Sequence, residues 1–374
     1  MAPIEIHAHQ HYHLFRKYHD RAQITTALLE GNHPANARRK IPAGVKYGNI
    51  QVVVGTHALI QEDVVFSDLG LAIVDEQHRF GVVQRGTLAQ KGMNPDMLVM
   101  TATPIPRTLA ITYHGDLDLS VIDEMPKNRI PVTTRVVTED KVPKVYQFIR
   151  DQVEKGNQCM IVYPLIEESE KLDLKAVEDG YDTLSKMIFP KFKLALIHGR
   201  MKKDEKDAVM DAFGRNEIQI LVSTTVIEVG IDVPNATVML IENAERFGLT
   251  QLHQLRGRIG RGTEKGYCIL IQRGMTATAR RRLDIISSTT NGFDISDEDL
   301  KLRGPGEFYG TRQHGFMKWK IADLVYDGDI ITEARKAAFD LVDYDPKLKK
   351  QEHAGIRSRF LHDYQHMLEY VNIS

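Results

Sequence analysis

The sequence LGLAIVDEQH, residues 69–78, is the clearest indicator of the fold. An apolar run passes directly into two carboxylates, Asp75 and Glu76. A short run of this kind is typical of a parallel strand buried on both faces, and ligand-binding groups collect where such strands end. The stretch therefore predicts a parallel α/β fold with chemistry at the carboxyl end of this strand.

Similar apolar runs with turn or polar residues at their carboxyl ends recur along the chain. They occupy residues 51–57, 97–104, 158–164, 193–199, 218–225, 237–243 and 268–272. Helix-compatible stretches lie between them, notably 141–156 and 202–216. Strands that alternate with helices predict parallel sheets covered by helices on both faces.

Two breaks in this rhythm divide the chain. Prolines and charges interrupt it in DEMPKNRIPV (123–132), which is typical of a linker between domains. Beyond about residue 285 the pattern becomes helical and then glycine-rich. We therefore expect a first α/β domain at 1–125, a second at 126–285, and a helical carboxyl-terminal region at 286–374.

Composition limits the class of protein. The 374 residues, 42% of them hydrophobic, suit two or three domains, and a net charge of −1 gives no global attraction to nucleic acid. No apolar run approaches a membrane span, and the first residues do not resemble a signal peptide. Cys159 and Cys268 lie far apart in apolar runs. We expect both cysteines to be buried and the protein to be cytoplasmic, without membrane contact.

Asp75 and Glu76 suit phosphate chemistry. One carboxylate can hold a magnesium ion, usually through water, while its neighbour orients or deprotonates an attacking water. On the dipeptide alone, an exposed acidic turn is the favoured alternative. Thr101 and Thr103 follow the next strand, and their hydroxyls can link a carboxylate site to a neighbouring domain; a turn ended by proline is the alternative.

The second predicted domain offers a Gly230-x-Asp232 unit and the arginine-rich HQLRGRIGRG (253–262). Arg258 and Arg261 are three apart at what the pattern predicts as a helical start, so they would share one helix face and suit pairing with phosphate oxygens. A solvated basic helix end is the alternative.

Taken in order, these motifs resemble those of the superfamily 2 helicases: VVGTHALIQ, DEQHRFGV, TATPIPRTL, STTVIEVGIDVPNA and HQLRGRIGR. DEQHRFGVVQR and TATPIPRTLA look most like the RecG family, with the transcription-repair coupling factors next. LRGPGEFYGTRQHG (302–315) is similar to the RecG form of the translocation motif. The resemblance covers nearly the whole chain from residue 50. Each motif alone is a weak signal, but six in the right order make chance very improbable.

The resemblance implies two RecA-like parallel-sheet helicase domains, the first incomplete, followed by a helical region with the translocation motif. It implies an ATP-hydrolysing DNA helicase that uses ATP and Mg²⁺, remodels stalled forks and branched recombination intermediates in DNA repair and recombination, and works as a monomer on forked double-stranded DNA.

The resemblance also assigns roles residue by residue. Asp75 would hold the metal, Glu76 would activate water, and Gln77 and His78 would complete the catalytic box. Thr101, Ala102 and Thr103 would couple the nucleotide state to domain closure. Gly230 and Asp232 would line the nucleotide cleft, and Arg258 and Arg261 would approach the γ-phosphate. The DNA contacts would come from Pro3, Thr56, His57, Thr224, Thr225, Arg303, Arg312 and Gln313.

The sequence departs from the family in one decisive respect. The pattern G-x-x-x-x-G-K-[ST], whose backbone and lysine hold phosphates, occurs nowhere in the 374 residues. The family places this loop upstream of its MAPTEILA motif, which resembles residues 1–8 here, and its wedge domain further upstream. We therefore expect the chain to lack both and to be inactive alone.

The first 50 residues match the family less well. Ile4 stands where the family has a helix-capping threonine. Pro42 and Gly44 fall where the family has a helix, and the proline is predicted to end it. His7, His9, His11 and His13 alternate in MAPIEIHAHQHYHLF (1–15). On a helix they form two pairs four residues apart, which can offer two metal ligands each. We interpret them as drift in a DNA-contact element.

Three classes of function stay open: a helicase ATPase recorded without its amino-terminal half, a DNA-binding remnant that does not hydrolyse ATP, and a metal-binding protein that uses the histidine run.

Overall fold

The computed structural model describes residues 1–31, 35–77, 80–102, 118–126, 129–164, 170–224, 233–274, 276–303, 322–323 and 326–371. The chain forms two compact units, one of Met1–Pro104 with Met125–Ile295 and one of Ile105–Glu124 with Ser296–Ser374. All the described strands lie in the first unit. We call residues 1–102 the amino-terminal lobe and residues 129–288 the six-stranded lobe. The predicted domain limits, 1–125, 126–285 and 286–374, stay predictions.

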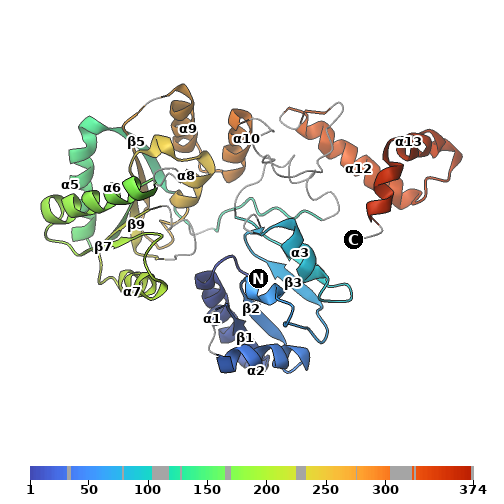
Figure 1. Cartoon of the computed structure of the whole chain (residues 1–374). Helices are drawn as coiled ribbons and strands as arrows, with labels where there is room; N and C mark the ends of the chain where they lie inside the picture. Colours follow the sequence, from blue (N-terminus) through green and yellow to red (C-terminus); the bar gives the residue numbers. More distant parts are fainter. Residues whose placement is uncertain are drawn as a thin grey trace. The chain divides into compact units, whose positions relative to one another are not determined.

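The six-stranded lobe, which contains β5, β7 and β9 in Figure 1, is built on one parallel sheet. Its strand order is β5-β10-β9-β6-β8-β7. Its strands are β5 (Thr133–Thr138), β6 (Gln158–Val162), β7 (Leu194–Ile197), β8 (Ile220–Ser223), β9 (Ala236–Ile241) and β10 (Tyr267–Gln272). Every residue of β6, β8 and β9 is buried. Burial on both faces accounts for the uninterrupted apolar runs in the sequence.

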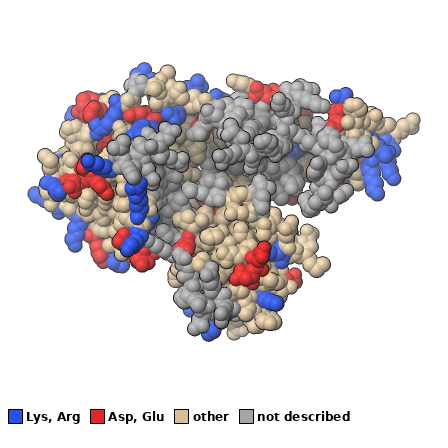
Figure 2. Space-filling model, viewed as in Figure 1, with Lys and Arg blue, Asp and Glu red and all other residues tan. Residues whose placement is uncertain are grey.

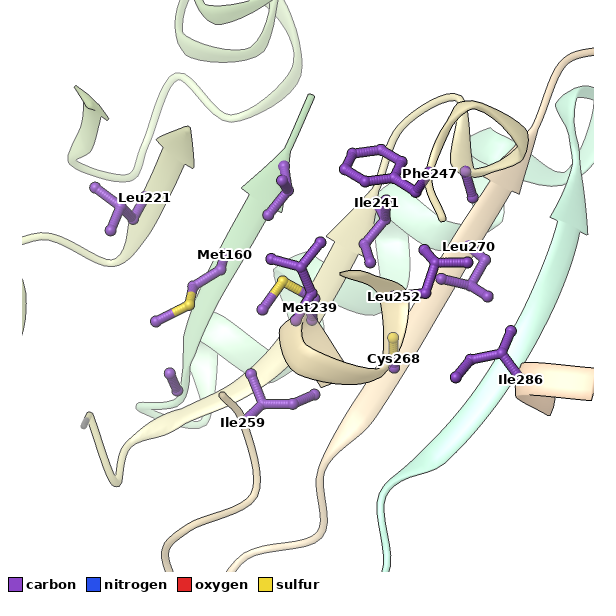
Figure 3. Close-up of a cluster of buried hydrophobic side chains, with 14 of the residues drawn as sticks. Met160, Leu221, Met239, Ile241, Phe247, Leu252, Ile259, Cys268, Leu270 and Ile286 are labelled. Carbon is purple, nitrogen blue, oxygen red and sulfur yellow. The ribbon is translucent and has the colours of Figure 1, made fainter. Parts of the chain in front are cut away.

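Alternate residues of these strands enter two separate cores, because successive side chains of a strand point to opposite faces. Met160, Leu221 and Met239 join the core that α8 and α9 cover (Figure 3). The other core receives side chains from α5 and α6. The helices are α5 (Val142–Glu154), α6 (Glu170–Thr183), α7 (Lys203–Gly214), α8 (Leu249–Arg256) and α9 (Ala277–Ser288).

The amino-terminal lobe contains two separate two-stranded parallel sheets, β1-β2 and β3-β4. Its elements are α1 (Glu5–Ala22), β1 (Thr26–Leu29), α2 (Ala35–Lys46), β2 (Val52–Gly55), β3 (Leu71–Val74), α3 (Val82–Ala89) and β4 (Asp96–Val99). The pairs are in register from Thr26 opposite Val52 and from Leu71 opposite Asp96. The carboxyl ends of β3 and β4 therefore meet at one sheet edge, which carries the predicted acidic site.

The predicted parallel α/β fold is confirmed. Each of the eight apolar runs contains a strand, and the helices predicted at 141–156 and 202–216 are α5 and α7. The pattern missed β1 and β5, because TALL is short and TTRVVT adjoins the proline-rich segment. Both cysteines are buried as predicted. Burial raises the pKa of Cys268 to about 12 and that of Cys159 further, so both are protonated at neutral pH.

The predicted helix break at Pro42 is wrong. Helix α2 runs from Ala35 to Lys46 with the proline inside it, and Tyr47 N–H still bonds to the carbonyl of Ala43 at 3.0 Å. An interior proline costs about 3 kcal/mol in a helix. Packing offsets this cost, since Val45 is buried and Ile41 packs against the Leu29 cluster. Ile4 caps α1 without a side-chain hydrogen bond, as predicted.

The described part beyond α9 is helical, as predicted. It comprises α10 (Gly292–Arg303), α12 (Gly328–Tyr344) and α13 (Ala354–Val371). Short helical turns complete the description: η1 (His57–Ile60), η3 (Glu139–Lys141), η5 (Leu184–Ile188), η7 (Ala244–Arg246) and η8 (Gln351–His353). None of the helices in the described residues is long and apolar enough to cross a membrane.

Candidate active site

The candidate site lies where β3 and β4 end side by side. Val74 and Val99 are paired, and Met100 N–H bonds to the Val74 carbonyl at 2.8 Å. Gln77 N–H then bonds to the Met100 carbonyl at 3.0 Å. Between these two bonds the chain turns sharply at Glu76, whose φ of 49° lies in the left-handed region. Backbone bonds on either side of the turn therefore hold Asp75 and Glu76 at the sheet edge.

The Glu76 carboxylate contacts the end of the neighbouring strand. Its Oε2 accepts a hydrogen bond from Ala102 N–H at 3.2 Å, and the hydroxyl of Thr101 donates to the same atom at 3.5 Å. The structure thus brings together three predicted residues from two strand ends. Because of these two hydrogen bonds, a shift of the Thr101–Ala102 segment would displace the Glu76 carboxylate. A shift of the carboxylate would in turn act on that segment.

Asp75 is held from two sides. Its Oδ2 is 3.0 Å from Nε2 of His11, and its Oδ1 accepts the N–H of Glu76 at 2.9 Å. The hydrogen bond from His11 is the main cause that lowers the pKa of Asp75, against a smaller opposing effect of burial. The carboxylate is therefore ionised at neutral pH and remains about a quarter exposed, at 23%.

Asp75 suits a magnesium ion that takes its other ligands from elsewhere. Mg²⁺ in nucleotide sites is commonly held by one or two carboxylates, waters and substrate phosphates. Within the described residues no group of three or more His, Cys, Asp or Glu side chains is arranged as a metal site. A single ionised carboxylate at a strand end fits a nucleotide-type magnesium site, in which waters and substrate phosphates supply the other ligands of the ion.

The alternating histidines lie on α1. The rings of His7 and His11 are 6.4 Å apart and those of His9 and His13 are 6.3 Å apart, so each predicted pair does share a helix face. Two of these residues contact carboxylates in the amino-terminal lobe, His9 with Glu30 at 3.1 Å and His11 with Asp75. The run therefore connects α1 to a strand end and to the acidic site, which the sequence pattern did not indicate.

The prediction that Arg258 and Arg261 share a helix face is wrong. Helix α8 ends at Arg256, and both arginines lie in the loop that follows. Gly260 has a φ of 67°, which lies outside the right-handed helical region, and the buried Ile259 anchors the loop to the core. The backbone N–H of Arg258 bonds to Leu255, and Nε of Arg261 bonds to the Gly257 carbonyl at 3.4 Å.

Arg256, which the sequence analysis did not single out, is the buried arginine of this motif. Its guanidinium donates to the carbonyls of Ile286 and Thr289 at 2.8 and 2.7 Å and contacts Nδ1 of His253 at 2.9 Å. It therefore ties the end of α8 to α9. Its position four residues after the apolar Leu252 is the signal that could have identified it as inward-facing.

The remaining predicted residues are placed as follows. Pro3 is half-buried in a bend before α1, and His57 is exposed at the start of η1. Thr56 and Thr224 are 2% and 0% exposed, at the ends of β2 and β8. Arg303 is the last residue of α10. The others lie outside the described residues: His78, Thr103, Thr225, Gly230, Asp232, Arg312 and Gln313. Their roles, and the DNA contacts as a whole, stay predictions.

Charge is mixed on the face seen in Figure 2. Over the six-stranded lobe, Lys and Arg side chains are interspersed with Asp and Glu. Several are paired, as Lys186 is with Asp182 and Arg215 with Glu217, both at 2.7 Å. This agrees with the near-zero net charge, and no broad basic patch is seen over the described part of the six-stranded lobe in this view.

Three family models match the chain. The DEAD/DEAH box helicase model matches residues 1–111, the helicase conserved C-terminal domain model matches 140–263, and the model of RecG domain 3, C-terminal, matches 289–374. The three matches follow the order of the motifs in the sequence.

Curated relatives named ATP-dependent DNA helicase RecG are similar over most of the chain. The Synechocystis protein is 49% identical over 98% of this chain and 44% of its own length. The Thermotoga maritima protein is 53% identical over 90% of this chain and 43% of its own length. The Bacillus subtilis protein is 47% identical over 96% of this chain and 53% of its own length. This chain thus spans about half the length of the relatives it matches.

Solved structures agree. A structure of RecG bound to a three-way DNA junction is 50% identical, has a TM-score of 0.70, and aligns with 88% of this chain and 43% of that one. The helicase MrfA bound to DNA and AMPPNP is 14% identical with a TM-score of 0.59, so it shows a shared fold alone. The parallel sheets, the acidic strand end and these similarities lead to one conclusion: the chain belongs to the RecG family of DNA helicases.

Proposed function

We propose that this chain supplies part of an ATP-driven DNA motor of the RecG type. The observation that carries the proposal is the contact of Glu76 with the Thr101–Ala102 segment, because it joins a candidate catalytic carboxylate to the end of the next strand. An acid that activates water must be oriented, and a motor must link that acid to a segment that moves. This contact meets both needs.

Asp75 would hold Mg²⁺, which neutralises charge on the transferred phosphate when it is bound. The lowered pKa of Asp75 keeps the carboxylate ionised for this role, and His11 fixes its orientation. Glu76 would accept a hydrogen bond from the attacking water with the oxygen that is not engaged by Ala102. Gln77, buried beside Met100, would hold the turn in place.

Arg258 and Arg261 would contact the phosphates from the loop after α8. The buried Ile259 and the left-handed Gly260 fix the backbone of this loop, so less backbone entropy is lost when a guanidinium pairs with phosphate. Such an arginine meets charge that develops in the transition state. Arg258 and Arg261 would therefore pair with phosphate from a rigid loop and not from one face of a helix.

The DNA substrate would be forked or branched duplex. RecG in the related structure is bound to a three-way junction, and this chain is 50% identical to it. Contacts to phosphate would dominate, so binding should weaken steeply with salt and show little sequence preference. A role in repair and recombination, a monomeric state and a cytoplasmic location belong to this proposal.

The 374 residues alone are proposed to bind DNA without hydrolysing ATP. The phosphate-loop pattern does not occur among them, and Asp75 with the two loop arginines provides no substitute for a backbone cradle. A second candidate function, a DNA-binding protein that never hydrolyses ATP, rests on the same observation.

A chimera separates these two functions. The 374 residues would replace the matching region of Thermotoga maritima RecG, to which they are 53% identical over 336 residues. We expect DNA-stimulated ATP hydrolysis by the chimera, and its loss by a factor of about 10³ or more with Arg261→Ala. Glu76→Gln should abolish turnover and leave fork binding measurable.

Exposed Arg215→Ala is the matched control, because its partner Glu217 lies beside it on the surface, and it should leave turnover unchanged. A folded chimera that binds forks but does not hydrolyse ATP would favour the second function.

A further inference from the structure

The end of helix α3 packs against the segment that connects η1 with β3. Residues 61–70 form this segment, which leads from Thr56 and His57 to the strand that carries the acidic pair. Helix α3 starts shortly after that pair, and it contacts both η1 and β3 (Figure 1). The helix therefore lies between the predicted DNA-contact residues and the candidate active site.

Lys91, which follows α3, donates two hydrogen bonds to this segment. Its Nζ lies 2.8 Å from the carbonyl oxygen of Gln61 and 2.7 Å from that of Val64. The two carbonyls belong to one turn, because Val64 N–H bonds to the Gln61 carbonyl at 3.1 Å. The ammonium group thus closes this turn, in the way that lysine side chains satisfy the last carbonyls of a helix.

Apolar packing fixes the same turn from the inside. Val64 is 2% exposed and lies in one buried cluster with Leu59 of η1. Burial lowers the pKa of Lys91, against the opposing effects of Asp63 and Glu62. The amine is therefore partly withdrawn from solvent, and its removal would leave the part-buried Val64 carbonyl without this donor.

Gly92 fixes the other end of the segment. A Cβ atom at this position would lie 2.8 Å from the carbonyl oxygen of Leu69 and 3.1 Å from its Cβ. Only glycine allows two backbones to approach this closely. Lys91 thus holds the start of residues 61–70, and Gly92 holds their end.

Hydrogen bonds connect the turn held by Lys91 to the predicted DNA-contact residues. Gln61 N–H bonds to the Ala58 carbonyl at 3.3 Å, and Leu59 N–H bonds to the Thr56 carbonyl at 3.1 Å. His57 lies between these groups at the start of η1 and is exposed. A displacement of the Gln61 carbonyl would therefore shift the backbone of Thr56 and His57.

We propose that Lys91 is a positioning residue, which holds Thr56 and His57 in the place where they contact DNA. The inference rests on the proposed function, because the DNA contact of these two residues belongs to it. The ammonium group is engaged with two carbonyls, so Lys91 acts through the turn and not on a DNA phosphate. Helix α3 links the same turn to the acidic pair, so a shift of the turn would also reach the active site.

The test measures binding of the full 374-residue chain to forked duplex DNA at several salt concentrations. Lys91→Met keeps the apolar stem and removes the N–H donors, whereas Lys91→Arg keeps a cation that can donate to both carbonyls. Lys46→Met is the matched control, because Lys46 is exposed on α2 in the same lobe and its loss removes the same charge. Hydrogen exchange is followed in residues 57–64, with β1 and β2 as the check that the lobe is folded.

We expect Lys91→Met to weaken fork binding by about tenfold and to speed exchange in residues 57–64, while β1 and β2 stay protected. Lys91→Arg should bind forks nearly as well as the unchanged chain. The salt dependence should stay the same in Lys91→Met, because only the loss of a direct phosphate contact lowers the slope of log affinity against log salt, by about one.

Two results would overturn the inference: an equal loss of affinity in Lys91→Met and Lys46→Met, or a lower salt slope in Lys91→Met. The first would assign the loss to charge in general, and the second would make Lys91 itself a DNA contact. Failure of the unchanged chain to bind forks is a distinct outcome, which would overturn the proposed function and this inference with it.

Discussion

The two lobes use the same building unit and differ in how completely they bury it. In the six-stranded lobe, β9 has six buried residues out of six, and helices cover both faces of the sheet. In the amino-terminal lobe, no residue of β4 is fully buried, and Leu98 is 48% exposed. A parallel strand gains stability from two covered faces and two paired edges. The amino-terminal lobe therefore carries Asp75 and Glu76 on the less completely buried scaffold.

This difference has a functional consequence. The segments that move in a motor belong to the less stable parts of a structure, because movement needs contacts that can be exchanged. Glu76 and Thr101 lie in the lobe with two separate sheets, whereas the arginine loop is anchored on a continuous core by Ile259. Substitutions in each lobe test this difference in burial.

The largest effect is expected from Leu221→Ala in β8. Leu221 is fully buried, and truncation of such a leucine costs about 3 to 5 kcal/mol of unfolding free energy. Leu98→Ala in β4 is the matched control, and it should cost less than about 1 kcal/mol because half of its surface is already exposed. Urea unfolding with hydrogen exchange as the readout for each lobe measures both. Equal costs would remove the contrast between the lobes.

Acid should weaken the six-stranded lobe through His253. Burial, and secondarily Arg256, lower its pKa from 6.5 to about 4. The unfolded chain therefore binds more protons than the folded one between these pH values, so this contribution is complete above pH 6.5 and falls as the pH drops toward 4. The loss amounts to about 3 kcal/mol at most.

Unfolding by urea at several pH values measures the effect, and His253→Asn is the control because its amide oxygen still accepts from Arg256 but does not titrate. An unchanged pH slope in this variant would show that another group is responsible.

Pro42→Ala should stabilise the amino-terminal lobe. It restores a backbone N–H and removes the ring from the interior of α2, so we expect a gain of roughly 1 to 3 kcal/mol. Pro42→Gly separates the two causes, since it also removes the ring but has low helix propensity, and it should gain about 1 kcal/mol less. Thermal unfolding followed by exchange in β1 and β2 reports on this lobe. A loss of stability with alanine would mean that the proline itself is required there.

The smallest effect is expected from Ile4→Thr. The backbone of Ile4 is extended, with φ −139° and ψ 160°, and no side chain caps α1. A threonine hydroxyl there can accept an N–H of the first turn, which is worth about 0.5 to 2 kcal/mol. Ile4→Val, which keeps the branched shape without the hydroxyl, is the control. The unfolding midpoint of the amino-terminal lobe should rise with threonine alone.

Local sequence patterns were sufficient for eight of the ten described strands and for part of the site. Apolar runs reveal buried parallel strands because such strands need apolar side chains on both faces. The acidic pair after β3 was predicted to serve a metal ion and an attacking water, and the threonine after β4 to link that carboxylate site to a neighbouring domain. The register of the two strands brings Glu76 and Thr101 together. A few consecutive residues determine whether a segment forms a strand and where that strand ends. These features can therefore be predicted without knowledge of the tertiary structure.

Such local patterns do not predict contacts between segments that are distant in the sequence. Only tertiary packing shows that α2 continues through Pro42, that Arg256 is buried while Arg258 and Arg261 lie in a loop, and that His11 holds Asp75. Strand order and packing depend on the free energy of the whole core, which no short window of sequence contains.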